Sequence, residues 1–321
     1  MIIVFEYDIK IAFINVKIQS NLDIGKFIIE PEPYNLYINY FIKEVKNEKS
    51  DYKIIINNEK NNNVKVLYEN KVLITKGNIE PMLEENYNKQ FSLFGNKGIV
   101  NRFILHVLEN EYRAIALHGC AIKHPKTDKI MIGIGPSGSG KSIFISNALK
   151  NGWKLIATEH VMIDEDFNLY KGNFYDNISP YALDFIKENL KNTFIYEDKR
   201  LIEPLGEKIY INYENYSVNE EKLKLNPNNA KFIILNFKKE SGKQIELKDM
   251  DFLLRMIQIS ASEKITFPLI FCNEILESNL NGNVKVRNKV INKIMQSDME
   301  KRILSGNYQD FEQYVYKELK I

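Results

Sequence analysis

One stretch of the sequence combines residue types that together can bind phosphate. It reads Gly135-Pro136-Ser137-Gly138-Ser139-Gly140-Lys141-Ser142 and matches the pattern G-x-x-x-x-G-K-S/T, whose backbone cradles phosphate groups. Glycine has no Cβ and tolerates positive φ, so successive backbone N–H groups can point at one anion. We therefore expect residues 135–142 to bind ATP or another nucleoside triphosphate.

The last two residues of this stretch have specific expected roles. The Lys141 ammonium should reach the terminal phosphates, and the Ser142 hydroxyl should ligate Mg²⁺. Residues 130–134 are apolar, as in a buried strand, and residues 143–150 can form a short helix that Asn151-Gly152 should cap at its end. The positive end of that helix dipole would favour an anion. The alternative is a surface loop rich in glycine and serine.

An acidic residue follows the next predicted strand. Residues 153–157 read as a buried strand, and Thr158, Glu159 and His160 come at its carboxyl end. Ligands of open α/β sheets bind at the carboxyl ends of strands. We therefore expect Glu159 to lie beside the phosphates as a metal ligand or general base. The alternative is a solvated acid at a strand end, and His160 should point to the opposite face from Glu159.

Several other polar residues have a structural and a chemical interpretation. His118 lies on the apolar strand candidate 114–122 and, taken alone, reads as a buried structural histidine. With Cys120 and His124 it could suggest a metal site, although alternate positions on one strand rarely complete a tetrahedral set. The acidic run 164–166 predicts a hairpin turn. Lys199-Arg200 is either a solvated pair or a contact to a phosphate or an acceptor carboxylate.

Length and composition narrow the class of protein. A chain of 321 residues exceeds the size at which one core usually stops growing, so we expect two domains. The net charge of +2, from 44 basic and 42 acidic residues, gives no case for binding nucleic acid or a membrane surface. Two cysteines make no disulfide framework. Together with an N-terminus that lacks a signal-peptide pattern, they predict a cytoplasmic protein.

The pattern of apolar residues divides the chain into 1–96 and 97–321. The first part should form a small antiparallel sheet that supports the second, with a tight turn at Glu69-Asn70. Its expected strands are 9–18, 52–56, 64–68 and 71–75. The second part has expected helices at 98–108, 143–150, 179–190, 249–260, 268–279, 284–304 and after Tyr308, and strands at 114–122, 130–134, 153–157 and 230–237.

Three segments in order also resemble a known family. They are Leu117-His118-Gly119, the glycine-rich stretch, and residues 151–156 followed by an acidic strand end. This arrangement resembles the HPr kinase/phosphorylase superfamily, and most closely the shorter HPr-kinase-like proteins found beside peptide-modification genes. The resemblance covers residues 97–200. It implies an α/β fold in which a P-loop nucleotide-binding domain with a mixed sheet follows a smaller strand-rich domain.

The resemblance also implies an activity and roles for individual residues. It implies an ATP-dependent kinase that transfers the γ-phosphoryl group to a hydroxyl, often that of a serine, on a peptide, protein or small molecule. Lys141 and Ser142 would contact phosphate and Mg²⁺, His118 would lie near the γ-phosphate, and Glu159 would act on metal or proton. Many members of the family assemble into oligomers, so the resemblance implies that this chain can form a homo-oligomer.

The sequence departs from the family pattern at one catalytic position. Thr158 stands where the family has the Asp that serves as general base, and a threonine hydroxyl is a poor base near neutral pH. Either Glu159 takes that role, or the chain is a nucleotide-binding switch or scaffold with weakened chemistry. Nucleoside triphosphate hydrolysis coupled to motion is a third alternative. The chain also lacks a Glu-Val-Arg-Gly-like stretch, so the phosphorylase activity of the family is not expected.

Overall fold

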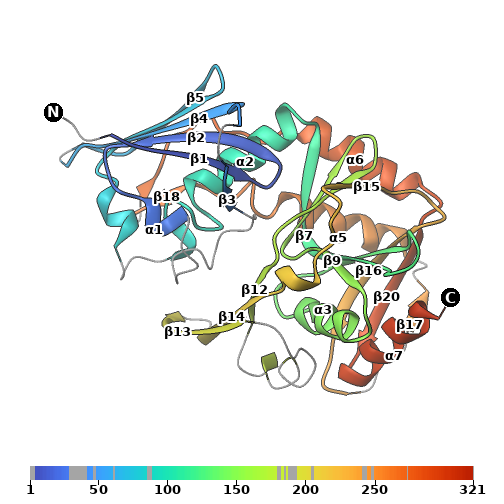
Figure 1. The fold of residues 1–321 in the computed structure, drawn as a ribbon. Coiled ribbons are helices and arrows are strands. Elements are labelled where there is room, and N and C mark those ends of the chain that lie inside the picture. The colour runs from blue at the N-terminus through green and yellow to red at the C-terminus, as the bar shows by residue number, and fades with distance from the viewer. Residues whose placement is uncertain are drawn as a thin grey trace. The chain divides into compact units, whose positions relative to one another are not determined.

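The computed structural model divides the chain into two compact units (Figure 1). It describes residues 4–28, 42–45, 48–60, 62–84, 89–178, 182–183, 186, 194–203, 206–240, 244–246, 249–272 and 274–320. One unit comprises Met1–Glu111 and Lys264–Asn283, and the other comprises Tyr112–Glu263 and Val284–Ile321. Both units contain helices and a mixed sheet, so the chain has an α/β fold.

The first unit is built on a sheet of six strands in the order β3-β1-β2-β4-β6-β5. The strands are β1 (Phe5–Ile11), β2 (Ile14–Ser20), β3 (Ile42–Glu44), β4 (Tyr52–Asn58), β5 (Lys65–Glu69) and β6 (Val72–Gly77). The prediction of an antiparallel sheet is wrong for two pairs, because β2 with β4 and β4 with β6 are parallel. Parallel neighbours need a long connection, and residues 21–51 provide one between β2 and β4.

Two tight turns shape this sheet. The predicted hairpin turn after Glu69 is confirmed: Asn70 and Lys71 have φ of 49° and 65° between β5 and β6. Positive φ at both central residues is the geometry of a type I′ turn, which matches the twist of the strands. The single strand predicted over 9–18 is instead a hairpin, since the chain turns at Ala12 (φ 55°) between β1 and β2.

A helix and a distant segment complete the first unit. Helix α2 (Ile99–Asn110) places Phe103 edge-on against Tyr52, with ring centroids 5.9 Å apart. From the distant segment, the Asn279 amide accepts a hydrogen bond from the Tyr68 N–H (2.8 Å) and donates one to the Tyr68 carbonyl (2.6 Å). These contacts place α2 and residues 264–283 with the first sheet, so the division differs from the predicted boundary between residues 96 and 97.

The remaining elements of the first unit are short. They are α1 (Gly25–Ile28), the 3₁₀ turns η2 (Glu80–Leu83) and η3 (Lys89–Phe91), and the strands β18 (Ile270–Phe271) and β19 (Glu274–Ile275). The helix predicted over 268–279 is therefore wrong, because β18 and β19 pair antiparallel there.

The second unit is built on a nine-stranded mixed sheet in the order β15-β11-β10-β7-β8-β16-β20-β17, with β9 also paired to β7. Its strands are β7 (Ala114–Lys123), β8 (Ile130–Ile134), β9 (Lys154–Ala157), β10 (His160–Asp164), β11 (Asn168–Tyr170), β15 (Lys222–Lys224), β16 (Ala230–Phe237), β17 (Gln244–Glu246) and β20 (Glu300–Gly306). The central strands β8, β16 and β20 run parallel, so their carboxyl ends share one edge of the sheet.

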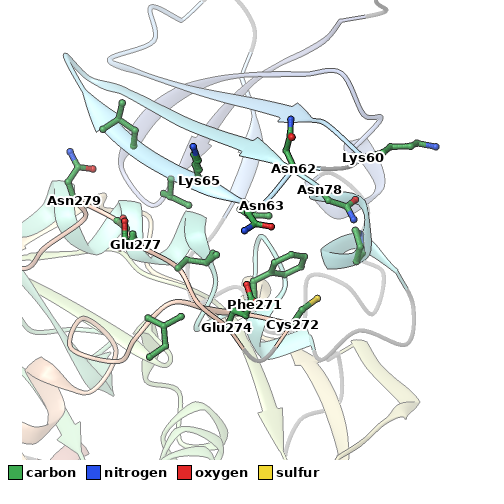
Figure 2. A pocket seen from close by; sticks show the side chains of 17 residues that line it. Lys60, Asn62, Asn63, Lys65, Asn78, Phe271, Cys272, Glu274, Glu277 and Asn279 are labelled. Atoms are coloured by element: carbon green, nitrogen blue, oxygen red, sulfur yellow. The ribbon is translucent and has the colours of Figure 1, made fainter.

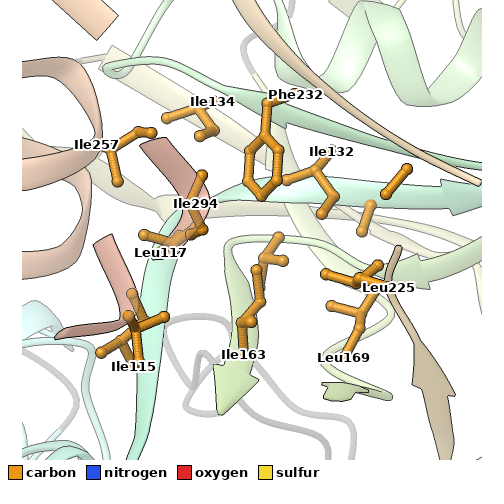
Figure 3. Close-up of a cluster of buried hydrophobic side chains, with 14 of the residues drawn as sticks. Ile115, Leu117, Ile132, Ile134, Ile163, Leu169, Leu225, Phe232, Ile257 and Ile294 are labelled. Atoms are coloured by element: carbon orange, nitrogen blue, oxygen red, sulfur yellow. The ribbon is translucent and has the colours of Figure 1, made fainter. Parts of the chain in front are cut away.

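Among the described residues, four helices cover this sheet: α3 (Lys141–Lys150), α5 (Met250–Ser262), α6 (Val284–Gln296) and α7 (Tyr308–Leu319). Side chains of α5 and α6 pack on alternate residues of the central strands and form a buried cluster (Figure 3), in which Ile257 and Ile294 meet Leu117, Ile132 and Ile134. Each such side chain contributes about 1.5–3 kcal/mol when fully buried. Helices α3 and α7 pack against each other, and α3 also contacts β7, β8 and β9.

Two helix predictions of this region have different outcomes. The helix predicted over 284–304 ends at Gln296, and residues 300–306 form β20, which pairs with β16 in the middle of the sheet. The helix predicted over 179–190 lies largely outside the described residues. A small separate sheet contains β12 (Tyr175–Ile178), β13 (Phe194–Glu203) and β14 (Gly206–Asn212), and the 3₁₀ turn η4 (Glu214–Tyr216) follows it. No helix within the described part of the chain is long and apolar enough to cross a membrane.

Candidate functional site

The glycine-rich loop connects the buried strand β8 to helix α3. Gly138 and Gly140 have φ of 81° and 94°, a region in which side chains with a Cβ are strained. A Cβ at Gly138 would meet nothing within 4 Å, whereas a Cβ at Gly140 would lie 2.7 Å from the Cβ of Phe237. The backbone at Gly138 is therefore open to a ligand, and Gly140 is required by both conformation and space.

The start of α3 offers backbone donors toward this loop. Gly140 occupies the N-cap position, and no side chain caps the helix. The first N–H groups of a helix have no acceptor within it and carry the positive end of its dipole. Ser139 is buried, and its Oγ has no hydrogen-bond partner among the described residues. Unpaired donors of this kind suit an anion with several oxygen atoms.

The far end of α3 holds the helix in place. The N–H of Gly152 donates to the carbonyl of Leu149 at 3.0 Å, and the N–H of Trp153 donates to the carbonyl of Ala148 at 3.0 Å. With Gly152 at φ 87°, these bonds form a Schellman motif, which confirms the predicted cap at 151–152. The buried Trp153 then leads directly into β9.

The side chain of Lys141 folds back over the loop. Its Nζ donates to the carbonyl of Gly135 at 3.0 Å and to the carbonyl of Pro136 at 3.1 Å. The side chain of Lys141 is half-buried, while Pro136, Ser137 and Gly138 are exposed. The ammonium is thus held at the loop by weak acceptors that an anionic ligand can replace.

Strand β7 fixes the position of Glu159 relative to the loop. On one side Gly119 pairs with Ile134, the last residue of β8 before the loop. On the other side the N–H of Gly119 donates to the carbonyl of Glu159 at 3.1 Å. Neighbouring strands lie about 4.8 Å apart, so the backbones of residues 134 and 159 are about 10 Å apart across β7. The start of the glycine-rich loop and Glu159 therefore lie at the same level of the sheet, on opposite sides of β7.

Glu159 follows the carboxyl end of β9, as the sequence predicted, and it lies at a break between β9 and β10. Both β9 and β10 pair antiparallel with β7, and Glu159 interrupts them with φ of 52°. This left-handed conformation costs roughly 1–2 kcal/mol for a residue other than glycine. Such strain persists where the surrounding structure fixes it, and it is common at functional sites.

The imidazole of His118 lies between two carboxylates. Its Nε2 is 3.2 Å from Oε2 of Glu159, and its Nδ1 is 2.6 Å from Oε2 of Glu263, the residue at the C-cap of α5. Burial alone would lower the pKa of His118, but the hydrogen bonds to Glu159 and Glu263 outweigh it, so the pKa is raised. Ionised carboxylates only accept hydrogen bonds, so the cationic ring, in which both nitrogens donate, is the form that satisfies both contacts.

Thr158 has a structural role in this geometry. Its side chain is buried, and its hydroxyl donates to the carbonyl of Tyr175 at 2.6 Å. The residue also forms an isolated bridge with Asn173. Its hydroxyl thus ties the β9–β10 break to the start of β12.

The buried thiol of Cys120 on β7 lies close to this region of the sheet. Burial raises the pKa of the Cys120 thiol to about 12. The charges of Lys141, Asp176 and Glu159 also act on the pKa of this thiol. Because alternate residues of a strand share a face, Cys120 and His118 lie on the same side of β7. The structure thereby brings His118, Lys141 and Glu159 into one region.

Two acidic residues of this region were not among the predicted site residues. Asp176 is buried on β12, and Glu263 comes from α5, 145 positions after His118. The sequence around Asp176 carries no motif, and nothing local links Glu263 to the loop. Only the packing of α5 on β7 brings Glu263 to the imidazole.

The other predicted side chains lie in ordinary structural settings. The turn predicted at 164–166 is confirmed, since it joins the antiparallel strands β10 and β11. His124 Nδ1 accepts from the N–H groups of Lys126 and Thr127, and Nε2 is 3.1 Å from the Leu319 carbonyl. The side chains of residues 199 and 200 lie outside the described part. Within that part, no three His, Cys, Asp or Glu side chains gather as metal ligands.

The first unit contains a separate groove of about 1140 Å³ (Figure 2). One wall is the edge strand β5 with Lys65, and the other is the segment that contains Phe271, Glu277 and Asn279. Its lining mixes amide, charged and apolar side chains and includes Cys272, whose backbone is left-handed with φ of 46°.

Comparisons with known proteins add no relative to this description. No protein-family model matches the chain, and a search of curated proteins finds no match.

Proposed function

We propose that the chain is an ATP-dependent phosphotransferase that moves the γ-phosphoryl group to a hydroxyl of a peptide, protein or small molecule. The observation that carries this proposal is the position of Gly119 between Ile134 and Glu159. It brings a loop suited to phosphates and a carboxylate suited to an acceptor proton to the same level of one sheet.

The loop fits a triphosphate. Gly138 leaves its face open, Gly140 holds the left-handed turn, and α3 begins without a side-chain cap. Together with the Lys141 ammonium, these features supply several donors and a positive charge. Another nucleoside triphosphate would present the same phosphates, so the loop by itself does not select adenine.

The residues present also suit a magnesium ion that arrives with the nucleotide. Mg²⁺ usually takes most of its ligands from phosphates and water and only one or two from protein. The Ser142 hydroxyl would be such a ligand, whereas the Glu159 carboxylate is assigned to the acceptor proton instead. When bound, the ion would neutralise charge on the phosphates. A cluster of three protein ligands is not needed for this role.

Glu159 is the residue we assign to the acceptor proton. In the proposed reaction the acceptor oxygen bonds to the γ-phosphorus, the bond from that phosphorus to the bridging oxygen breaks, and the acceptor proton passes to Glu159. Such transfer depends mostly on positioning and charge neutralisation. His118 holds the Glu159 carboxylate at 3.2 Å, and the cationic ring with Lys141 adds positive charge near the phosphates.

The test separates binding from transfer. Calorimetry with Mg²⁺ and ATP should detect binding by the intact chain and lose it in Lys141→Ala. With γ-labelled ATP and candidate hydroxyl acceptors, Glu159→Gln should still bind ATP but lose label transfer by about 100-fold or more. Tight ATP binding without transfer to any hydroxyl acceptor would refute the kinase assignment, and absence of binding would refute the whole proposal.

A second candidate function is a nucleotide-dependent switch or scaffold. It is favoured by Thr158, whose hydroxyl is engaged by the Tyr175 carbonyl and does not serve as a base. A switch predicts negligible turnover and a partner whose affinity changes with nucleotide. If Thr158→Asp creates transfer activity in a chain that otherwise has none, the switch is the better description of the natural protein.

A further inference from the structure

We infer that Glu263 is a positioning residue of this site: it orients the His118 ring so that the ring holds the Glu159 carboxylate in its working position. This inference rests on the proposed function for its kinetic consequence. Its structural part concerns the contacts among three side chains and can be tested without any acceptor.

The last turn of α5 grips His118 at two points. The Ser260 hydroxyl donates to the main-chain carbonyl of His118 at 3.0 Å, and the Glu263 carboxylate accepts from the ring at 2.6 Å. The first contact fixes the backbone of β7, and the second fixes the rotation of the ring. His118 is only 6% exposed, so solvent does not compete strongly for either contact.

The position of Glu263 is unfavourable for the helix itself. A carboxylate at the C-terminal end of a helix faces the negative end of the helix dipole, which disfavours it. The last turn of α5 contains no basic residue to offset this. The compensating interaction in the structure is the contact of the Glu263 carboxylate with Nδ1 of His118 at 2.6 Å. Glu263 therefore stabilises the position of the His118 ring and does not stabilise helix α5.

The same ring then acts on a residue whose backbone is already strained. Glu159 has φ of 52°, and its carbonyl is held by the N–H of Gly119, the neighbour of His118 in β7. With the main chain fixed, the remaining freedom of Glu159 lies in its side chain, which His118 Nε2 contacts at 3.2 Å. Rotation of the ring would release that contact. Glu263 thus acts on Glu159 through His118, without touching a reacting atom.

The kinetic test compares three changes at one position. Glu263→Ala should lower kcat for label transfer by about 10- to 100-fold, the usual effect of removing a residue that orients a catalytic group. The Kd for Mg²⁺–ATP, which the loop determines, should change by less than about twofold. Glu263→Gln keeps an oxygen acceptor at the same reach and should restore part of kcat, whereas Glu263→Asp is one methylene shorter and should restore less. Glu240→Gln, which changes an exposed acid of the same unit, is the matched control.

NMR spectroscopy can detect the hydrogen bond between His118 and Glu263 directly. The chain has 4 histidines, so the His118 ring signals can be assigned by comparison with His118→Gln. A ring N–H that donates to a carboxylate at 2.6 Å should give a far-downfield proton resonance. That resonance should be present in the wild type and Glu240→Gln and absent in Glu263→Ala.

The outcomes separate the inference from the proposed function. A wild-type chain that transfers no label overturns the proposed function, and the downfield resonance then decides alone whether Glu263 orients the ring. If transfer occurs and Glu263→Ala leaves kcat unchanged, the inference is wrong while the proposed function stands. Persistence of the resonance in Glu263→Ala also overturns the inference. Loss of ATP binding in that variant would point to a damaged fold rather than a lost orientation, and would likewise count against it.

Discussion

A Cβ on Gly119 would lie 2.5 Å from the carbonyl oxygen of Gly133, so β7 and β8 pack closer at this pair than any other residue would allow. This is also the level at which β7 holds Ile134 on one side and Glu159 on the other. The close approach thus controls the spacing between the loop and the acidic side chain.

Gly119→Ala should therefore damage stability and the site together. Forcing a methyl group into this contact should lower the free energy of unfolding by about 1–3 kcal/mol, measured by urea denaturation, and should weaken Mg²⁺–ATP binding. Gly152→Ala is the control, because Gly152 has positive φ but open space around it. Its strain should lower stability by roughly 1–2 kcal/mol without changing nucleotide affinity. Equal effects of both variants on affinity would contradict the role of Gly119.

The two left-handed glycines of the loop should respond differently to alanine. Gly140→Ala adds a contact with Phe237 to backbone strain, so it should lower stability by about 2–4 kcal/mol and abolish nucleotide binding. Gly138→Ala carries strain alone, because the space around it is open. It should cost about 1–2 kcal/mol and weaken binding through the added methyl group. Thermal unfolding and calorimetry on both variants check this ranking, which fails if Gly138→Ala is the more destabilising.

Asp164 should give stability a defined dependence on pH. Burial would raise its pKa, but hydrogen bonds from the Asn168 side chain and backbone, the Tyr170 hydroxyl and the Asp166 backbone outweigh it, so the pKa is lowered. The folded state therefore favours the carboxylate. The stabilisation is fully present above the unfolded pKa of about 3.9 and is lost as pH falls through the lower folded value.

The matched variant for this prediction is Asp164→Asn. It should be less stable than the wild type by about 1–3 kcal/mol near neutral pH, and the difference should shrink as pH falls below about 4. Urea denaturation at a series of pH values measures both curves. Parallel curves down to the acid limit would show that Asp164 is not preferentially ionised in the folded state.

Glu318 should be one of the most costly single acids to remove. It is buried on α7, and its carboxylate binds the ammonium of Lys231 at 2.8 Å and that of Lys129 at 3.4 Å. Glu318→Gln removes the carboxylate beside the partly buried Lys129 and leaves Lys231 with Glu300 at 2.7 Å as its remaining acid, and it should cost about 3 kcal/mol. Glu312→Gln, which removes an exposed partner of Lys150 from the same helix, should cost less than about 1 kcal/mol. Similar chemical denaturation midpoints for the two variants would argue against this account.

Asn279 should protect the edge of β5 in the first unit. Asn279→Ala removes both amide contacts to the Tyr68 backbone and should cost about 1–2 kcal/mol. Hydrogen exchange at the Tyr68 N–H should accelerate, because the lost carboxamide oxygen was its acceptor. Asn78→Ala is the control: it lines the same groove, and its side chain makes no hydrogen bond within the described residues. Unchanged exchange at Tyr68 in Asn279→Ala would contradict the assignment.

Features encoded by neighbouring residues were predictable from the sequence. The turns at Asn70 and Asp164 and the cap at Gly152 depend on a few adjacent residues, and the structure has them where expected. The strand–loop–helix order around Lys141 also follows from a local pattern. Short apolar runs with clear breaks, such as residues 130–134, carry enough information to be recognised.

Features that depend on distant partners were not predictable. Residues 300–304 read as the continuation of a helix, and pairing with β16 makes them part of a strand. The parallel pairing of β2 with β4 depends on a crossover rather than on either strand. Glu263 reaches His118 because α5 packs on β7, a contact between residues far apart in the sequence. The spacing of apolar residues indicates which face of a helix or strand is buried, but it does not indicate which other element packs against that face.

Residues 264–283 leave the second unit after Glu263, join the first, and return at Val284. Neither unit is therefore encoded by one continuous stretch of the gene. A fragment that ends at residue 111 would lack Asn279, which pairs with β5, and the remaining fragment would keep residues 264–283 between α5 and α6 without the sheet on which they pack. To express the units separately, residues 264–283 must be added to the N-terminal fragment, and Glu263 must be joined directly to Val284 in the C-terminal fragment. Recombination that exchanges the first unit between proteins would require three crossovers, after residues 111, 263 and 283.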